Sequence, residues 1–325
     1  IPALLGVVVI TFILMRVLPG DPAVFFANGS NAGQQEIDDL RHKMGLDRSM
    51  PVQLLTYLRD VATGNLGNSL TTGQPVVADM RRRLPASLEL TFTALFIALV
   101  LSIPLGVIAA LRPGSLLDHS VRMLCTLGVC VPTFVSGLLL IYVFYYLLGW
   151  APDPTARLDI FASTPPDITG FYLLDFAIVG DWDGFRAAFA QLLLPAISMA
   201  LFVLAPLARM TRASMLAVLG SDFIRTAHSV GLPPLRIIVV YALRNALLPV
   251  LTITGIVFST MLGANVLVEQ VFSWPGVASY ALNALLSSDY APVQAFVLLM
   301  ATIFVLVNVG IDVLYGIADP RISIE

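Results

Sequence analysis

The chain has 325 residues, of which 58% are hydrophobic and only 12% are charged. Soluble domains average roughly 45–50% apolar and about 25% charged residues, so this composition excludes a pair of soluble domains, and its high hydrophobicity excludes a disordered chain. The formal net charge of −3 provides no basic surface for nucleic acid. The composition therefore predicts an all-α polytopic membrane protein that crosses the bilayer several times.

Six apolar stretches approach the length of about 20 residues that a bilayer-spanning helix needs. They are 2–18, 88–111, 123–150, 192–208, 246–268 and 293–317. Proline and glycine recur inside several of them, which indicates either kinks and close helix packing or hinges that move during transport. We therefore expect a first transmembrane helix within 1–19, an extracytoplasmic helical segment over 20–87, and a core transmembrane domain with the other five helices over 88–325.

The segment 20–87 is expected to be folded. Three apolar residues share one face of a helix predicted over 34–45: Ile37, Leu40 and Met44. Pro51 suits the first turn of a second helix. Pro75 is predicted to open a third short helix that carries three consecutive arginines: Arg81, Arg82 and Arg83. These arginines suit either a ridge that faces solvent or lipid headgroups, or a docking contact for an acidic partner.

Arginine placement orients the spans, because short cationic loops remain in the cytoplasm. The segment 209–244 holds five arginines against Asp222 alone, and the segment 151–191 holds two arginines against six aspartates. The segment 269–292 holds no lysine or arginine. We therefore expect 209–244 in the cytoplasm, its two neighbouring loops outside, and both termini of a six-span chain in the cytoplasm.

The chain has one lysine, Lys43, and this lysine does not follow a glycine-rich turn. A phosphate-binding P-loop requires such a lysine, so any ATP-driven work needs a separate ATPase chain. The three histidines fall in different loops, and Cys125 and Cys130 suit small apolar core positions. We expect no catalytic residue, no bound cofactor and no metal in this chain.

Ionisable side chains deep in a membrane are functional candidates, and the predicted spans hold few of them. Arg16, Glu89 and Asp312 lie near span ends, where we expect them to anchor the helices by reaching the interface. No predicted span carries an internal carboxylate pair or a histidine. This weighs against an ion-coupled secondary transporter and against a membrane-embedded enzyme.

The cytoplasmic segment 209–244 predicts two short helices joined by a tight turn. Ser221 is expected to cap a helix over 222–230 through its hydroxyl, and Gly231 is expected to end that helix in the left-handed conformation. Two prolines then enforce the turn before helical character resumes. Such a protrusion suits a groove on another protein, or it simply connects two spans.

Residues 222–227 read Asp-Phe-Ile-Arg-Thr-Ala, Gly231 follows, and 242–250 read Ala-Leu-Arg-Asn-Ala-Leu-Leu-Pro-Val. Together they resemble the coupling-loop motif of ABC-importer permeases, in the branch that carries dipeptides, oligopeptides and nickel. Further pieces occur in the family's order: 18–22, 67–69, 83–90, 270–276, 289–290 and 319–321. The general motif begins Glu-Ala-Ala, whereas 225–227 read Arg-Thr-Ala here, so a salt bridge that needs the glutamate is not carried over.

The resemblance implies a type I ABC-importer permease fold in the bacterial inner membrane. It implies a transmembrane permease subunit of an ATP-driven importer of di- and oligopeptides, with nickel, metallophores or another small solute as alternative cargo. The implied partners are a homologous second permease subunit in a heterodimer, two ATP-binding subunits that hold ATP and magnesium, an extracytoplasmic substrate-binding protein, and membrane lipid. The residues expected to couple this chain to the ATPases are Asp222, Arg225, Thr226, Ala227, Gly231 and Arg236.

The apolar stretch 246–268 directly follows the coupling segment, so movement of that segment passes into it without a flexible linker. This makes the stretch the best-placed candidate for a gate. The residues expected to line the pore or form the gate are Ser259, Met261 and Asn265. The alternative for this stretch is ordinary small-residue packing between helices.

Overall fold

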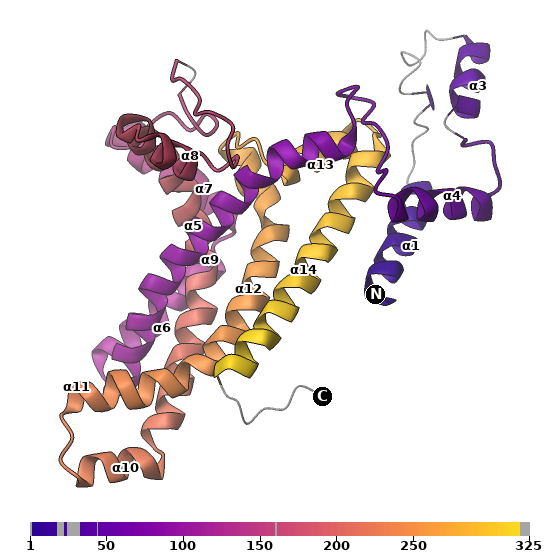
Figure 1. Cartoon of the computed structure of the whole chain (residues 1–325). Helices are drawn as coiled ribbons and strands as arrows, with labels where there is room; N and C mark the ends of the chain where they lie inside the picture. The colour runs from indigo at the N-terminus through magenta and orange to yellow at the C-terminus, as the bar shows by residue number, and fades with distance from the viewer. Residues whose placement is uncertain (1, 18–22, 25–32, 44, 160, 319–325) are drawn as a thin grey trace. The chain divides into compact units, whose positions relative to one another are not determined.

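The computed structural model describes residues 2–17, 23–24, 33–43, 45–159 and 161–318, which form helices joined by turns and loops (Figure 1). The principal helices, in chain order, are α1 (Pro2–Val17), α3 (Gln34–Lys43), α4 (Met50–Ala62), α5 (Val76–Leu111), α6 (Leu116–Cys130), α7 (Thr133–Leu140), η2 (Ile141–Leu147), α8 (Tyr172–Val179), α9 (Trp182–Leu219), α10 (Asp222–Ser229), α11 (Pro234–Arg236), η3 (Ile237–Leu243), α12 (Arg244–Val271), α13 (Val277–Leu286) and α14 (Tyr290–Ala318). The segments η2 and η3 are wound as π-helices. Over these residues the predicted all-helical class is confirmed.

The chain forms two compact units. The first comprises Ile1–Ser87 and Pro275–Phe304, and the second comprises Leu88–Trp274 and Val305–Glu325. Helices α5 and α14 each contribute residues to both units. The second unit therefore contains the segment that resembles a coupling loop, and the first contains the segment that follows α1.

Four helices in the described part of the chain are long and apolar enough to cross a membrane. They are Val76–Leu111, Trp182–Leu219, Pro234–Val271 and Tyr290–Ile311. A fifth candidate is the bent pair formed by Leu116–Gly128 and Thr133–Leu147, and two shorter apolar helices cover Leu4–Leu14 and Val277–Leu286. Backbone groups in hydrocarbon must be paired inside the chain, which a continuous helix achieves. Four of the predicted stretches thus fall within long apolar helices.

The predicted span 123–150 is not one helix. Helix α6 ends at Cys130, α7 begins at Thr133, and the two helices are bent by 100°. The cause is the residue pair between them, because a residue before proline is pushed out of the helical region. Val131 accordingly has ψ 121°, and Pro132, with ψ 142°, is the N-cap of α7.

The short helix predicted after Pro75 is also wrong, because Val76 opens the 36-residue helix α5, which continues to Leu111. Pro85 and Pro104 lie inside it without ending it. Membrane helices tolerate internal proline when neighbouring helices and local adjustments satisfy the freed carbonyl group. The three arginines therefore lie in the first turns of a long helix rather than on a separate one.

In the first unit, the buried carboxylate of Asp289 holds the loop that precedes α5. Its Oδ2 atom accepts hydrogen bonds from the Ser69 hydroxyl at 2.7 Å and from the backbone N–H groups of Leu70 at 2.8 Å and Thr71 at 3.1 Å. The guanidinium of Arg83 lies 4.9 Å from the ring centroid of Tyr280. One arginine of the predicted ridge thus packs on an aromatic face instead of pointing only to solvent.

Other predictions for this unit hold. Ile37 and Leu40 of α3 pack with Ala23 and Leu46, whereas Met44 lies outside the described residues. Pro51 occupies the first turn of α4 as expected. The apolar face of α3 therefore packs on the residues before and after it, whereas α4 has no buried residue.

Helix α9 is central to the second unit, since it contacts α6, α7, α8 and α12. Close approach to α5 depends on Gly106. A Cβ atom at this position would lie 2.6 Å from the Thr211 Cβ atom and 2.8 Å from the carbonyl oxygen of Ala208. Neither neighbour is the end of a flexible side chain, so the two helices can pack at this distance only with glycine there.

We predict that Gly106→Ala destabilises the chain by about 1–3 kcal/mol, the usual effect of overpacking a well-packed core. Thermal unfolding in detergent measures this as a lower melting temperature. The matched control is Gly263→Ala in α12, where an added Cβ meets no atom within 4 Å. Equal melting temperatures for the two variants would contradict the packing argument.

Candidate functional site

Helices α10 and α11 form a paired-helix protrusion at one end of the second unit (Figure 1). Gly231 ends α10 with φ +76°, as predicted. Its N–H donates to the carbonyl oxygen of His228, and the Leu232 N–H donates to that of Ala227. This is the Schellman pattern that satisfies the last carbonyl groups of a helix.

The start of α10 differs from the prediction in one respect. Ser221 occupies the N-cap with the expected extended backbone, at φ −77° and ψ 155°. Its hydroxyl does not accept a hydrogen bond from the first turn and instead donates to the carbonyl oxygen of Val218 at 2.5 Å. The residue is therefore at the predicted position, but its side chain ties α10 back to the end of α9.

The inner face of α10 is packed against the unit. Ile224 and Ala227 are 2% and 6% exposed, and they belong to one apolar cluster with residues of α5, α9, η3 and α12. The buried members from those four helices are Ala110, Met215, Ile237, Ala242 and Ala246. Because α10 is fixed by side-chain packing as well as by its loops, a displacement of α10 must move the helices that it touches.

The outer face of α10 carries most of the predicted coupling residues. Asp222 and Arg225 have exposed side chains and form an ion pair at 3.2 Å, and Thr226 is also exposed. Gly231 and Arg236 are exposed in the turn and in α11. Ala227, the sixth predicted residue, faces inward instead.

Three apolar residues share this outer surface, and their exposure was not predicted. They are Phe223, Val230 and Leu235, which are 45%, 73% and 74% exposed. We call the exposed set the coupling surface: Asp222, Phe223, Arg225, Thr226, Val230, Gly231, Leu235 and Arg236. The signal in the sequence was the presence of apolar residues on both sides of a tight turn, where solvent-facing loops are usually polar.

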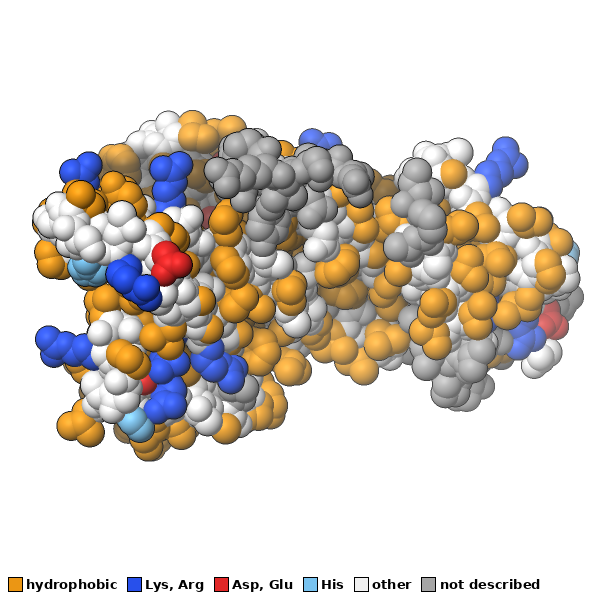
Figure 2. All heavy atoms as spheres, turned by 90° about the horizontal axis from the view of Figure 1, so that it is seen from below, with side chains coloured by type: hydrophobic (Ala, Val, Ile, Leu, Met, Phe, Trp, Pro, Cys, Tyr) orange, Lys and Arg blue, Asp and Glu red, His pale blue; other side chains and the backbone are white. Residues whose placement is uncertain are grey.

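Arginine side chains gather at the end of the second unit that carries α10 and α11 (Figure 2). The exposed arginines of these elements and their neighbours are Arg112, Arg122, Arg209, Arg225, Arg236 and Arg244. Apolar residues that alternate with arginine are typical of protein interfaces. The coupling surface therefore has the composition of a docking site.

A buried carboxylate braces the helices beside this surface. Asp118, at the start of α6, accepts hydrogen bonds from Arg212 of α9, at 2.7 Å from Nε and 2.8 Å from Nη2. It also accepts one from the Gly114 N–H at 3.0 Å. A two-pronged arginine–carboxylate contact fixes orientation as well as distance. The brace therefore holds α6 against the part of α9 that leads into α10.

The family model described as "Binding-protein-dependent transport system inner membrane component" matches residues 102–324, and the model for the N-terminal region of such membrane components matches residues 1–91. The chain belongs to this family of inner membrane transport components. The family and the apolar helices together show a multi-pass protein of the inner membrane.

Individual relatives are permease proteins. A di/tripeptide transport system permease protein of Pseudomonas aeruginosa is 43% identical over 322 residues, which cover 99% of this chain and 95% of the relative. A probable D,D-dipeptide transport system permease protein of Escherichia coli is 41% identical, covering 98% of this chain and 93% of the relative. A dipeptide permease protein of Alkalihalophilus pseudofirmus is 38% identical, covering 99% and 96%. The resemblance read from the motifs is therefore confirmed, and this chain is a permease subunit rather than an ATPase.

At the other end of its helices, this permease chain carries a second buried ion pair. Glu89 of α5 is 6% exposed and lies 2.5 Å from Nη2 of Arg157, which also donates to the Gly170 carbonyl oxygen at 3.0 Å. The Leu173 N–H donates to the other Glu89 oxygen at 2.8 Å, and the Arg157 guanidinium stacks 3.5 Å from the Tyr172 ring centroid. Glu89 does anchor its helix as expected, but through a loop partner rather than by reaching the interface.

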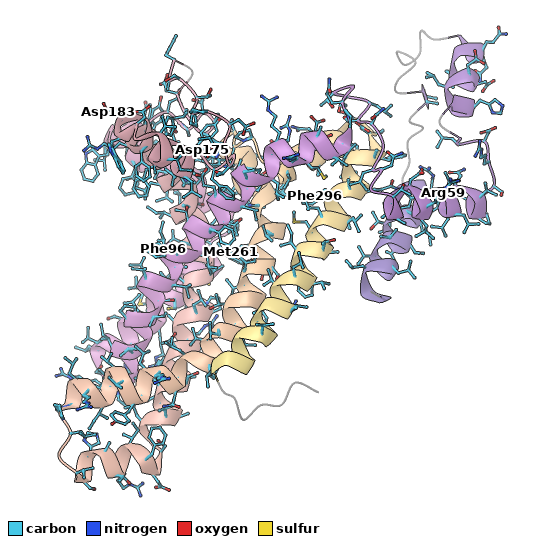
Figure 3. All side chains as sticks on the ribbon, in the orientation of Figure 1. Arg59, Phe96, Asp175, Asp183, Met261 and Phe296 are labelled. Carbon is cyan, nitrogen blue, oxygen red and sulfur yellow. The ribbon has the colours of Figure 1, made fainter. Side chains whose placement is uncertain are left out.

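The three candidate gate residues lie in α12 at different depths. Met261, labelled in Figure 3, and Asn265 are each 1% exposed, and the Asn265 side-chain amide donates to the Thr91 hydroxyl at 3.0 Å. Ser259 is half-buried, and its hydroxyl donates to the Gly255 carbonyl oxygen. Beyond the first turn of α12, the exposed positions form a different stripe: Ile256, Thr260, Gly263, Leu267 and Gln270. Two of the three candidates therefore face the interior of the unit.

We predict that Glu89→Gln lowers the free energy of unfolding by about 3–5 kcal/mol, because it leaves the Arg157 charge buried without its partner. The expected readouts are a lower melting temperature and faster proteolysis within the loop 151–171. The control is Asp183→Asn, since Asp183 and its partner Arg186 are 99% and 83% exposed (Figure 3). If the control destabilised the chain as much as Glu89→Gln, the ion pair would not be the cause.

Proposed function

We propose that this chain is one of two permease subunits that line the pore of an ATP-driven dipeptide importer. The observation that carries the proposal is the coupling surface, an exposed apolar and cationic face on a helix pair that is packed into the transmembrane helices. The cargo is inferred from the names of the relatives, which are permease proteins of dipeptide or di/tripeptide transport systems. Together these make peptide import the function to test first.

The proposed topology has six spans with both termini in the cytoplasm. It takes as crossings the four long apolar helices, the bent pair as one span, and the shorter apolar helix Leu4–Leu14, and it leaves the other short apolar helix, Val277–Leu286, outside the count. The arginine-rich end with α10 and α11 then lies in the cytoplasm, and the aspartate-rich segment 151–191 lies outside. The segment 20–87 lies on the outer side, where an extracytoplasmic binding protein has access to it.

In the proposed mechanism, ATP and magnesium are held by two partner ATPase subunits, and this chain contributes motion. Closure of the ATPase pair draws the coupling surfaces of this chain and of a homologous second permease together. The contacts of Ile224 and Ala227 pass this displacement into α9, η3 and α12. The spans then alternate between inward-open and outward-open arrangements, and the binding protein delivers peptide to the outward-open state.

The decisive experiment is reconstitution of this chain with its second permease, two ATPases and binding protein in liposomes. We expect accumulation of a radiolabelled dipeptide that requires ATP on the ATPase side and the binding protein on the other side. Accumulation of a chelated metal or another solute instead of di- and tripeptides would replace the proposed cargo. Accumulation driven by an ion gradient without ATP would overturn the proposed class.

We predict that Arg225→Glu lowers dipeptide uptake about tenfold or more, because it reverses a charge on the coupling surface. A loss of about 1.4 kcal/mol in the free energy of ATPase binding lowers the binding constant tenfold. The melting temperature of the variant should equal that of the unmodified chain, since the Arg225 side chain is 76% exposed. The control is Arg186→Glu on the outer side, which is equally exposed and should leave uptake unchanged. Equal loss in both variants would remove the special role of Arg225.

We predict that the pore lies along the exposed stripe of α12 rather than at its buried polar residues. In a Cys130→Ala background, which removes the exposed native cysteine, Thr260→Cys should react with a small polar thiol reagent. Asn265→Cys should stay unlabelled, because Asn265 is 1% exposed. The reverse labelling pattern in the transporting complex would place the pore at the residues first expected from the sequence.

A further inference from the structure

The first unit contains a polar pocket of about 180 Å³ where α1, α4 and Gln294 of α14 meet. This volume is far larger than the ~10–15 Å³ that admits a single water molecule. Its charged lining residues are Arg16, Arg48 and Asp60. The pocket belongs neither to the coupling surface nor to the exposed stripe of α12, and it has no role in the proposed coupling mechanism.

Arg16 lines this pocket and is held in place by two neighbours. Its Nε atom donates to the side-chain oxygen of Gln53 at 2.9 Å, and its guanidinium lies 5.2 Å from the ring centroid of Phe12. Gln53 is itself fixed, because its amide donates to the carbonyl oxygens of Leu46 and Arg48 at 3.1 and 2.8 Å. Within the described residues, no protein group accepts a hydrogen bond from the two Nη groups of Arg16.

The other charged groups of the pocket are Arg48, which is exposed, and Asp60, which is half-buried. Neither Arg48 nor the carboxylate of Asp60 takes part in an ion pair or a side-chain hydrogen bond among the residues that the structure describes. Tyr57 lines the same pocket, and burial raises the pKa of its hydroxyl to about 12, so the hydroxyl stays protonated. The pocket therefore presents two cationic groups, a neutral hydroxyl and one carboxylate to whatever enters it.

The surroundings of the pocket are apolar and exposed. On α1, Leu5, Ile13 and Leu14 are 54%, 46% and 55% exposed. On α4, Val52 and Leu55 are 43% and 66% exposed. A polar pocket at the end of an apolar helix, beside an amphipathic helix with exposed leucine, is typical of the headgroup level of a bilayer.

We propose that this pocket binds the headgroup of a membrane phospholipid that carries a phosphate and a primary ammonium group. The guanidinium groups of Arg16 and Arg48 bind the phosphate, because their fork of N–H donors matches its oxygens. The carboxylate of Asp60 receives the ammonium group. The acyl chains of the lipid then lie on the exposed leucine and isoleucine side chains of α1. A soluble zwitterion such as a dipeptide has no acyl chains and would leave these side chains uncovered, which favours a lipid.

The test measures which lipids remain on the purified transporter. The whole complex is extracted in detergent, supplied with equal amounts of phosphatidylethanolamine and phosphatidylglycerol, and analysed by native mass spectrometry. We expect preferential retention of phosphatidylethanolamine, and we expect Arg16→Gln to weaken it about tenfold through loss of charge-assisted hydrogen bonds. Asp60→Asn should keep lipid binding but lose the preference for phosphatidylethanolamine.

The matched control is Arg59→Gln. Arg59 is labelled in Figure 3 on α4, is exposed, and is next in sequence to Asp60 but does not line the pocket. Retention in this variant should equal that of the unmodified complex. A loss as large as that of Arg16→Gln would mean that general surface charge, and not the pocket, holds the lipid.

Two further measurements separate binding from folding and from cargo. Arg48→Gln changes an exposed side chain, so it should keep the melting temperature measured without lipid while losing the stabilisation that added phosphatidylethanolamine gives. Equal lipid stabilisation of this variant and the unmodified complex would overturn the proposal. Displacement of the retained lipid by millimolar dipeptide would also overturn it, and would assign the pocket to the cargo.

Discussion

A backbone N–H or C=O group inside hydrocarbon has no water to pair with, and this constraint decides the form of most of the chain. It explains why α5 and α9 run for 36 and 38 residues without interruption. It also explains why Pro195 and Pro206 are absorbed inside α9 instead of ending it. Within the membrane, the long helices are consequently the frame on which this protein places its polar groups.

The same medium restricts where charges can lie. Glu89 and Leu111 are separated by 22 residues of α5, or about 33 Å along the helix axis, close to the thickness of the hydrocarbon layer. The ion pair of Glu89 lies at one end of this stretch, and that of Asp118 follows the other end. Each of these two carboxylates has an arginine and a backbone N–H donor beside it, which offsets its desolvation. Charged braces therefore flank the apolar stretch and tie loops and helices together without entering it.

The positions of the long helices could be predicted because hydropathy is a local property of the chain. The bend at Val131 and Pro132 also had a local signal, which is the proline itself. One continuous span was nevertheless predicted, because the residues on both sides of the proline are apolar. The ion-pair partners of Glu89 and Asp118 could not be predicted from the sequence. Several arginines were expected on the same side of the membrane as each carboxylate, and any of them could have formed the pair. Choosing Arg157 and Arg212 requires the packing of helices that are distant in sequence.

The candidate site likewise has some features that could be predicted from the sequence and others that could not. Gly231 was predictable, because only the left-handed conformation allows the turn that follows α10. The orientation of α12 was not, because its polar residues, among them Ser259, Thr260 and Asn265, are spread around the helix and indicate no single exposed face. Asn265 was expected to line the pore because it is polar. Its polarity instead places it in the interior of the second unit, because a polar side chain in a span pairs with another polar group, here the hydroxyl of Thr91.

The length of α10 links these observations to the proposed coupling. A helix of eight residues is not stable by itself in water, where even good helix formers need about 12–15 residues. Its order therefore depends on Ile224 and Ala227, which are packed into the apolar cluster shared with α5, α9, η3 and α12. A partner that grips the outer face of such a helix cannot move it alone, because separation from the cluster would cost the helix its structure. In the proposed coupling, the shortness of α10 thus ties its position to the transmembrane helices that it packs on.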